Sequence, residues 1–374
     1  MNMNRRVLSN RWLSPLLRCA AAGAALLAVF VARALPLSAP PDLTGVEFLS
    51  KSEDFRVWLN GEEQFVFKSV RTGNHGSHDI ASMSFLGFDL KAPVEVKIEP
   101  RAKVSSLALR PYNAGINGKQ EGNAITFKLD KPQHVVLVVN ESYNPVLVLS
   151  AKPPHTPPKP ADVKHFFGPG VHDVGKHKPL ASGDKVYLSE GAIVKGSFAI
   201  SNASNVSITG RGLIYNGHFP HEEAFRVVKG DTTRDVLIEG VTVCHSPGWI
   251  VSFWNGNTNL TVRDVTMVGN WWMNSDGVQT GTKGLLVENC FMQCNDDNFS
   301  LNGVCQDVVS LVVEDESGTQ QHPAPDAQTL AEGWAKTERR TPIKWGELKR
   351  AALRIDSTWG PNGEFLVDEC WLSR

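Results

Sequence analysis

The sequence predicts an all-β protein in which an N-terminal antiparallel β-sandwich is followed by a right-handed parallel β-helix. Three observations carry this prediction. Short segments between residues 46 and 149 alternate apolar and polar side chains, which is typical of half-buried strands. A segment with five prolines, AKPPHTPPKPAD (151–162), follows them. Beyond it, one strand motif recurs at intervals of 30, 24 and 25 residues, which indicates a solenoid.

The composition is that of a globular protein with room for two domains. The chain has 374 residues, of which 41% are hydrophobic and 21% charged. These values exclude a disordered chain and a multi-span membrane protein. The formal net charge is −1, and without a basic excess we expect no nucleic acid among the partners. Six cysteines are too few for a disulfide scaffold of this size. We expect a monomer.

The N-terminus has the pattern of a secretory signal. A stretch with four arginines at 5–18 precedes a short apolar run at 19–32 and then small residues. We expect residues 1–39 to be a signal peptide and the mature protein to be secreted or periplasmic. The alternative is an uncleaved membrane anchor, although a membrane span needs about 20 apolar residues. Beyond this segment we expect no contact with a membrane.

Residues 45–150 form the predicted sandwich. The Asn60-Gly61 pair has the composition of a tight hairpin turn. No catalytic grouping stands out in this domain. The expected strands lie at 55–61, 63–70, 94–99, 124–129, 134–139 and 145–150.

Residues 151–163 are the predicted linker, because prolines cannot donate to a sheet. Residues 164–374 are the predicted β-helix. The motif that defines its frame occurs as VSIT (206–209), VLIE (236–239), LTVR (260–263), LLVE (285–288) and FLVD (365–368). A leucine-rich repeat has the same period, but the Leu-x-x-Leu-x-Leu frame is missing. A β-helix with one coil per repeat fits better.

Two details of the frame lead to further expectations. Cys290 and Cys370 occupy the position that valine holds in other repeats, which predicts that they are buried core residues. Cys290 and Cys294 lack the partner set of a zinc site, so we expect no metal. Residues 314–353 lack the frame and carry many charges, which predicts an irregular or helical insertion.

Two acidic segments hold the candidate catalytic residues. The frame aligns 277–279 with 298–300, which places Asp276 beside Asp297 on the next coil and brings Asp296 to the same patch. Carboxylates that lie close together raise one another's pKa, so one stays protonated while the others ionise, as glycoside hydrolysis requires. The alternatives are ordinary turn residues, a hydrogen-bonded ladder without chemistry, or a Ca²⁺ site.

The same segments carry a family resemblance. Asn274-Ser275-Asp276-Gly277 followed by Asn295-Asp296-Asp297 resembles the N-x-D-G … D-D signature of the polygalacturonase-like β-helix hydrolases, glycoside hydrolase families 28 and 49. Segments 165–175 and 186–198 are similar to the entry into the β-helix in family 49, the dextranases and isopullulanases. Those proteins also carry an N-terminal sandwich. The resemblance covers roughly residues 46–310 and implies a secreted polysaccharide hydrolase that needs no cofactor.

The resemblance also implies roles for the three carboxylates. Asp296 is then the general acid, and Asp276 and Asp297 hold and deprotonate the attacking water in an inverting reaction. Two departures matter. The Gly-His-Gly and Arg-Ile-Lys motifs of polygalacturonases are missing, and Arg354-Ile355-Asp356 ends in a carboxylate. The family's solenoid runs several coils further, so the resemblance implies a C-terminally shortened solenoid whose activity stays open.

Aromatic residues near the aspartates predict how a glycan is bound. Flat indoles stack on the apolar faces of sugars, and without an arginine clamp a neutral glucan suits this site better than a pectin. The alternative for each tryptophan is a place in the core. The predicted substrate contacts are Trp249, Trp254, Trp271, Asn274, Gln279 and His245.

Other functions remain open at this stage. The nearest is a polygalacturonase, or a polysaccharide lyase on the same fold that uses Ca²⁺. A lyase needs a base such as lysine or arginine in frame with the aspartates, and the sequence shows none there. A non-catalytic carbohydrate-binding protein is the alternative from a different class, and a shortened solenoid favours it.

Overall fold

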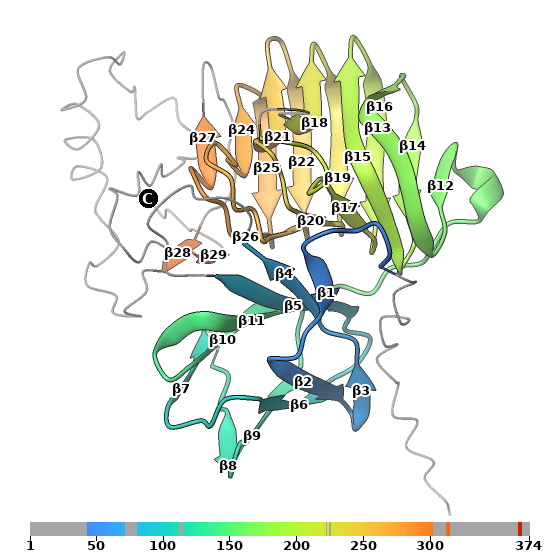
Figure 1. Ribbon diagram of the computed structural model, residues 1–374. Coiled ribbons are helices and arrows are strands. Elements are labelled where there is room, and N and C mark those ends of the chain that lie inside the picture. Colours follow the sequence, from blue (N-terminus) through green and yellow to red (C-terminus); the bar gives the residue numbers. More distant parts are fainter. Residues whose placement is uncertain are drawn as a thin grey trace, which may run out of the picture. The chain divides into compact units, whose positions relative to one another are not determined.

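The computed structural model describes residues 43–71, 81–111, 115–221, 223, 226–301, 312–314 and 366–368. In these ranges every regular element is a strand except one 3-10 helix, η2 (Pro160–Asp162), so the described chain is all-β, as predicted (Figure 1). None of the described elements is a helix long and apolar enough to cross a membrane. The predicted signal peptide (1–39) lies outside the described residues, as does the predicted insertion (314–353) apart from its first residue.

The N-terminal domain is a sandwich of two sheets. One sheet has the order β1-β4-β5-β11-β10-β7 and the other β3-β2-β6-β9-β8. The Asn60-Gly61 turn joins β2 to β3 with both residues at positive φ, as the hairpin prediction requires. The strands are β1 (Leu49–Lys51), β2 (Phe55–Leu59), β3 (Glu62–Gln64), β4 (Phe67–Val70), β5 (Ser82–Asp89), β6 (Val94–Pro100), β7 (Leu107–Arg110), β8 (Lys119–Glu121), β9 (Ala124–Leu129), β10 (Gln133–Val139) and β11 (Ser142–Lys152).

The sandwich differs from the prediction in three respects. Strands β1, β5, β7 and β8 lie outside the segments expected from the sequence. One strand pair, β5 with β11, is parallel, so the first sheet is mixed rather than antiparallel. The reason is that β5, which sequence patterning missed, enters the centre of the sheet between β4 and β11. In addition, β11 continues to Lys152, so the first two residues of the predicted linker belong to a strand.

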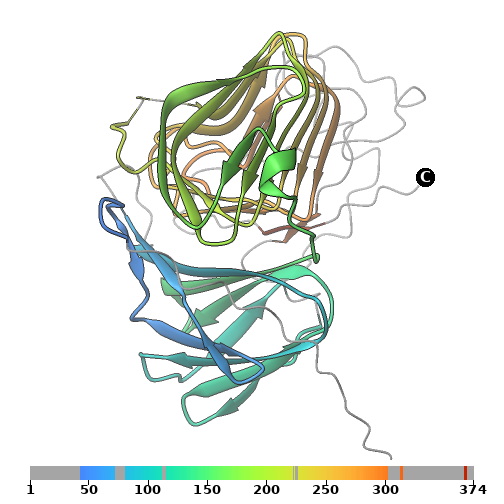
Figure 2. The same cartoon turned by 90° about the vertical axis from the view of Figure 1, so that its right-hand side faces the viewer.

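The second domain is a parallel β-helix (Figure 2). Its first two described coils contribute two strands each, because β13 and β15 are long, and each of the four later coils contributes three. One face of every coil belongs to a six-stranded sheet, β12-β14-β16-β19-β22-β25, and the other two belong to a ten-stranded sheet that branches at β15. Four of the predicted frame motifs stack in register, since Val206 pairs with Val236, Val236 with Leu260 and Leu260 with Leu285.

The strands of the six-stranded sheet are β12 (His165–Phe167), β14 (Lys185–Leu188), β16 (Ser204–Gly210), β19 (Arg234–Glu239), β22 (Thr258–Arg263) and β25 (Lys283–Glu288). The strands of the ten-stranded sheet are β13 (Gly170–Leu180), β15 (Ala192–Ser201), β17 (Leu213–Tyr215), β18 (Arg226–Asp231), β20 (Thr242–Cys244), β21 (Trp249–Trp254), β23 (Thr266–Val268), β24 (Val278–Thr280), β26 (Phe291–Met292) and β27 (Phe299–Leu301).

Each coil turns into the six-stranded sheet through a residue in the left-handed conformation. Asn205, Asp235, Asn259 and Gly284 occupy equivalent register positions, and all four have positive φ. Asparagine, aspartate and glycine tolerate this conformation best. The Asn259 amide also donates to the Asp235 carboxylate at 2.8 Å. This column of small polar residues fixes the start of each coil, so the strands that follow it stay in register.

The fifth predicted copy of the frame motif is not part of the β-helix. Strand β29 (Leu366–Asp368) pairs antiparallel with β28 (Val312–Glu314) in a separate two-stranded sheet. The prediction for 365–368 was therefore wrong, because alternating apolar residues favour a strand without saying which way its partner runs. Cys370 lies outside the described residues.

A shared apolar core joins the sandwich to the β-helix. Phe67, Phe85 and Val148 of the sandwich belong to one buried cluster with Tyr215 and Phe291 of the solenoid. Buried apolar surface of this kind is the main source of stability in folded proteins. The sandwich therefore covers the part of the ten-stranded sheet that is formed by β17, β20, β23 and β26.

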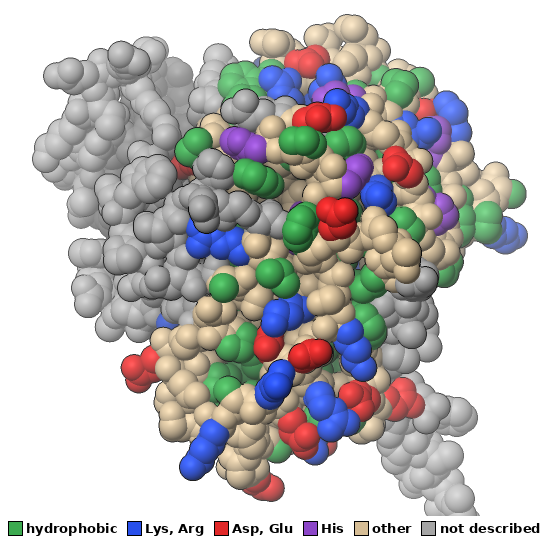
Figure 3. All heavy atoms as spheres, viewed as in Figure 1, with side chains coloured by type: hydrophobic (Ala, Val, Ile, Leu, Met, Phe, Trp, Pro, Cys, Tyr) green, Lys and Arg blue, Asp and Glu red, His purple; other side chains and the backbone are tan. Residues whose placement is uncertain are grey.

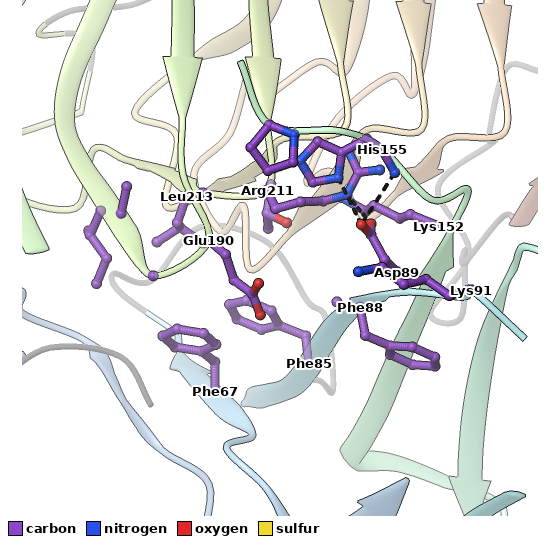
Figure 4. A pocket seen from close by; sticks show the side chains of 17 residues that line it. Phe67, Phe85, Phe88, Asp89, Lys91, Lys152, His155, Glu190, Arg211 and Leu213 are labelled. Carbon is purple, nitrogen blue, oxygen red and sulfur yellow. Dashed lines mark hydrogen bonds and ion pairs between the residues drawn. The ribbon is translucent and has the colours of Figure 1, made fainter. Parts of the chain in front are cut away.

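Buried polar contacts accompany this core. Arg211 donates from Nε to the Asp89 carboxylate at 2.5 Å and from a terminal nitrogen to the Pro153 carbonyl at 2.7 Å. His155 of the linker also contacts the Asp89 carboxylate, at 2.8 Å. Lys152 is 2% exposed and donates to the Gly240 carbonyl at 2.6 Å. These groups line a cavity between the two domains (Figure 4), and the stacked rings of Phe67 and Phe85 form its opposite wall.

Candidate active site

The three candidate carboxylates lie in the connections between β23 and β24 and between β26 and β27, all four of which are strands of the ten-stranded sheet. Asp276 lies two residues before the start of β24, and Asp297 lies two residues before the start of β27. Val278 pairs with Phe299, and the amide of Gly277 donates to the Asp297 carbonyl at 2.9 Å. This is the alignment that the repeat frame predicts. The two aspartates are thus neighbours on successive coils, which in a β-sheet lie about 4.8 Å apart.

Gly277 permits this close approach of the two coils. A Cβ atom at this position would meet the Asn298 carbonyl oxygen at 2.6 Å and the Met292 sulfur at 3.0 Å. A side chain here would therefore push the two carboxylate-bearing segments apart. The glycine that follows Asp276 in the sequence has this steric role.

Asp276 is the buried member of the cluster. It is 5% exposed, and burial raises the pKa of its carboxyl group to about 7, with further increases from the charges of Asp296 and Asp297. A hydrogen bond from the Trp249 side chain opposes the shift. One carboxyl oxygen, Oδ1, has no hydrogen-bond partner in the described part of the chain. Near neutral pH, Asp276 therefore holds a proton that it can share with a bound group.

Asp296 and Asp297 are more accessible to solvent than Asp276. The Asp296 side chain is exposed, and its two oxygens accept hydrogen bonds from the backbone amides of Asn274 at 3.2 Å and Asp297 at 3.0 Å. These bonds orient the Asp296 carboxylate toward the turn that carries Asp276. Three acidic groups consequently share one small patch, with one buried and two near the surface.

Two of the predicted aromatic contacts border this patch. Trp249 lies in register with Asp276, because the amide of the next residue, Ile250, donates to the Asp276 carbonyl at 2.8 Å. Trp254 ends the same strand, and its ring centroid lies 5.5 Å from that of Trp249. The Trp254 indole N–H donates to the Ser252 hydroxyl at 2.7 Å, which turns the ring back toward Trp249. Both side chains are half-buried, so part of each ring faces solvent.

The structure places Trp271 and His245 away from this patch, at the interface with the sandwich. Trp271 is 4% exposed and donates to the Ser69 hydroxyl at 2.9 Å. His245 is 1% exposed and contacts the same hydroxyl at 2.8 Å. Burial lowers the pKa of His245 to about 4, which keeps the ring neutral. The prediction that these two residues contact substrate does not fit their burial, since the sandwich covers this side of the coil.

The other two predicted contacts lie closer to the carboxylates. Asn274 is half-buried and adopts φ +61°. Its backbone amide donates the hydrogen bond to the Asp296 carboxylate. Gln279 is on β24, is 5% exposed, and accepts a hydrogen bond from the Ser252 hydroxyl at 3.4 Å. Their position beside the cluster agrees with a role in orienting substrate, and that role stays a prediction.

Sequence patterning missed two cations on β18, the strand that pairs with β21 from the preceding coil. Arg226 pairs in register with Trp249, and Lys229 pairs with Ser252. The guanidinium carbon of Arg226 lies 5.3 Å from the Trp249 ring centroid and 5.8 Å from that of Trp254. The repeat frame contained the signal, because counting back one coil from Trp249 leads to Arg226.

The cysteines of this region belong to the core, as predicted. Cys290 is 3% exposed and belongs to the apolar core of the solenoid, against which Cys294 also packs. Burial raises the pKa of the Cys290 thiol to about 12. Within the described ranges, no group of three or more His, Cys, Asp or Glu side chains has the geometry of a metal site.

Comparisons with known proteins support the fold. The structure is similar to that of Dex49A from Penicillium minioluteum, with 18% sequence identity and a TM-score of 0.53 over 67% of this chain. This is a likeness in fold to a parallel β-helix protein. The chain spans 64% of the length of Dex49A.

A weaker likeness links the chain to the family 28 exopolygalacturonase of Yersinia enterocolitica, with 11% identity and a TM-score of 0.32 over 70% of this chain and 61% of that one. No family model matches the sequence, and no curated protein matches it. The likeness to Dex49A confirms the resemblance predicted from the aspartate motifs as a resemblance in fold.

Proposed function

We propose that this protein is a secreted glycoside hydrolase that cleaves a polysaccharide with inversion of configuration, using Asp276, Asp296 and Asp297. The observation that carries the proposal is the environment of Asp276. It is a buried carboxyl with a pKa raised to about 7, and two more accessible carboxylates lie beside it. Hydrolysis of a glycosidic bond needs one protonated and one ionised carboxyl group at the same site. The fold shared with Dex49A is compatible with this activity.

The position of the proton suggests how the roles are divided. The resemblance to the hydrolase families implies that Asp296 is the general acid. In the free protein, however, Asp276 is the carboxyl whose pKa is raised to about 7. We therefore assign the general acid to Asp276, with Asp296 and Asp297 activating the attacking water. Inversion requires acid and base about 6.5–9.5 Å apart, which leaves room for that water.

The aromatic groups supply the binding surface for sugar. Trp249 and Trp254 present two rings on the strand next to Asp276, and indole faces stack on the apolar faces of sugar rings. Trp249 also links binding to chemistry, since its side chain hydrogen-bonds to Asp276. A sugar stacked on Trp249 thus lies within reach of the proposed acid.

The experiment is the release of reducing sugar by the purified mature chain. The substrates are dextran, pullulan, polygalacturonate and several hemicelluloses, and the variants are Asp276→Asn and Asp296→Asn. Arg263→Gln is the matched control, because Arg263 is a charged residue of the other sheet of the same solenoid. We expect release by the parent and the control and loss in both aspartate variants. A folded parent that releases sugar from none of the substrates, or release that survives both aspartate changes, would contradict the proposal.

A further inference from the structure

Two cations lie on the strand one coil before the tryptophans. Arg226 and Lys229 are on β18, one coil before Trp249 and Trp254 and two coils before Asp276. Both cationic side chains are half-buried. With coils about 4.8 Å apart, the two cations lie roughly 10 Å along the solenoid from the coil of Asp276. A glycan that runs along the stacked coils from the carboxylates reaches the tryptophans first and these cations next.

The Arg226 guanidinium lies against two aromatic rings. Its contacts are with the two indoles, at 5.3 and 5.8 Å from the ring centroids. Within the described ranges it makes no hydrogen bond and no ion pair with an acidic side chain. An arginine that stacks on aromatic rings keeps its N–H groups in the plane of the guanidinium, where they can bind a carboxylate or sulfate through two parallel hydrogen bonds.

Lys229, on the same strand, adds a second positive charge to that of Arg226. It lies in register with Ser252, Gln279 and Ser300 on the following coils. Among the described residues, Lys229 forms no ion pair. Both cations act on the nearby His177. Burial lowers the pKa of its ring most, and the charges of Lys229 and Arg226 lower it further. Two positive charges therefore lie one coil before the tryptophans, and the carboxylates lie one coil beyond them.

We propose that Arg226 and Lys229 form a subsite for an acidic group, a carboxylate or a sulfate, on a sugar that neighbours those joined by the cleaved bond. This inference rests on the proposed function, because it assumes that a glycan lies along the coils. It changes the expectation of a neutral substrate. That expectation followed from the missing Arg-Ile-Lys motif, whereas these cations come from an earlier coil. The acidic group binds at Arg226 while its sugar ring stacks on Trp249 or Trp254.

The test measures binding in the absence of turnover. All proteins carry Asp276→Asn, and their dissociation constants are measured by affinity electrophoresis in two sets of polysaccharides. The first set is dextran, carboxymethyl-dextran and dextran sulfate, and the second is polygalacturonate and its methyl ester. Each set holds the backbone constant while the charge changes. Arg226→Gln with Lys229→Gln is the test variant, and Lys185→Gln with Lys283→Gln on the six-stranded sheet removes the same charge elsewhere.

We expect tighter binding of at least one acidic polysaccharide than of its neutral counterpart. The test variant should weaken that binding by about tenfold or more, as the loss of a charge-assisted hydrogen bond predicts. The control variant should leave it unchanged. A preference for carboxymethyl-dextran and polygalacturonate identifies a carboxylate, and a preference for dextran sulfate identifies a sulfate.

Three results would overturn the inference: no preference for acidic over neutral polysaccharide, a preference that the test variant retains, or an equal loss in the control variant. The outcome is separate from that of the proposed function. A charge preference that depends on Arg226 in a protein without hydrolase activity would support the subsite and contradict the hydrolase. Hydrolysis without charge preference would do the reverse.

Discussion

Two columns of charged residues cross the same solenoid, and their charges are arranged in opposite ways. On the six-stranded sheet, Arg263 lies in register between Glu239 and Glu288 and forms ion pairs with both. On the ten-stranded sheet, Asp276 lies in register with Asp297, and Asp296 adjoins them. In the first column the charges alternate in sign, and in the second they repeat.

The difference teaches where a solenoid keeps its chemistry. Stacking brings equivalent positions of successive coils to about 4.8 Å, so like charges in one column repel unless one of them takes up a proton. The alternating column avoids that cost, and the surface in Figure 3 likewise intersperses acidic and basic side chains. The repeating column incurs the cost at Asp276. A cost that a simple substitution would remove points to a functional demand.

The largest expected effect comes from changing the repeating column. We expect Asp276→Asn and Asp296→Asn each to lower kcat on a polysaccharide by about 10²–10⁴-fold, the usual contribution of a general acid or base. The two variants should differ on an aryl glycoside whose leaving group departs without protonation. Loss of the acid is tolerated on that substrate, so Asp276→Asn should regain activity and Asp296→Asn should not. The measurement is kcat for both variants on both substrates, and the opposite pattern would return the acid's role to Asp296.

The second largest effect is expected for the buried ion pair between Arg211 and Asp89, whose removal should lower the stability of the fold. Arg211 and Asp89 pair between the two domains with side chains only 8% and 11% exposed. Burial alone would raise the pKa of Asp89, but hydrogen bonds from His155 and Arg211 lower it. Removing one member of a buried pair strands the other, so we expect Arg211→Met to lower the free energy of unfolding by about 3–5 kcal/mol.

Urea denaturation of Arg211→Met, Asp89→Leu and the double variant checks this expectation. The double variant should lose less stability than the sum of the two single variants, because neither charge is then left alone. Additive losses would show that the two side chains stabilise the interface separately rather than as a pair.

The third prediction concerns the energetic cost of the repeating column. The pKa of Asp276 is raised from 3.8 to about 7 on folding. The folded state therefore binds the proton more tightly than the unfolded state, and this stabilisation is present below pH 4 and is lost as the pH rises through 7. Asp276→Asn removes a carboxyl that must ionise in a buried place. We expect the variant to be more stable than the parent by up to a few kcal/mol at pH 8, with little gain at pH 4.

Thermal or urea unfolding of the parent and Asp276→Asn at pH 4, 6 and 8 measures that difference. Asp184→Asn is a useful contrast, because Lys164 and other hydrogen-bond donors lower the pKa of Asp184 to about 2 against the opposing effect of burial. Its substitution should lower stability at pH 8. If both substitutions changed stability in the same direction, the two aspartates would not differ in the way proposed.

The repeat frame alone predicted much of this arrangement. Because the motif spacing sets the register, the sequence located the coils from Val206 to Leu285 and placed Asp276 beside Asp297. What the frame could not predict is which side of each coil is covered. Trp271 and His245 lie in the same stretch of sequence as the aspartates, but they face the sandwich. Only the packing of a distant domain decides that.

The missed strand β5 has the same explanation. Its side chains are buried on both faces, with Leu86 and Phe88 in the sandwich core and Met83 and Phe85 in the core shared with the solenoid. A strand that is covered on both sides loses the alternation by which strands are recognised. The antiparallel pairing of 366–368 was likewise beyond the frame, since strand direction is not encoded in its apolar pattern.

The smallest effect is expected in the alternating column, and it provides the strictest test of the comparison. The side chains of this column are between 31% and 40% exposed, for Arg263, Glu239 and Glu288 alike. Exposed ion pairs contribute about 0.2–1 kcal/mol each, and salt screens them. Arg263→Gln should therefore lower the free energy of unfolding by about 1 kcal/mol or less at low salt and by less still in 0.5 M NaCl, as measured by urea denaturation. It leaves Glu239 and Glu288 two coils apart, where solvent separates their charges. A loss several times larger, or one that salt does not reduce, would mean that alternating charge stabilises these coils strongly, and the contrast with the aspartate column would then be one of degree.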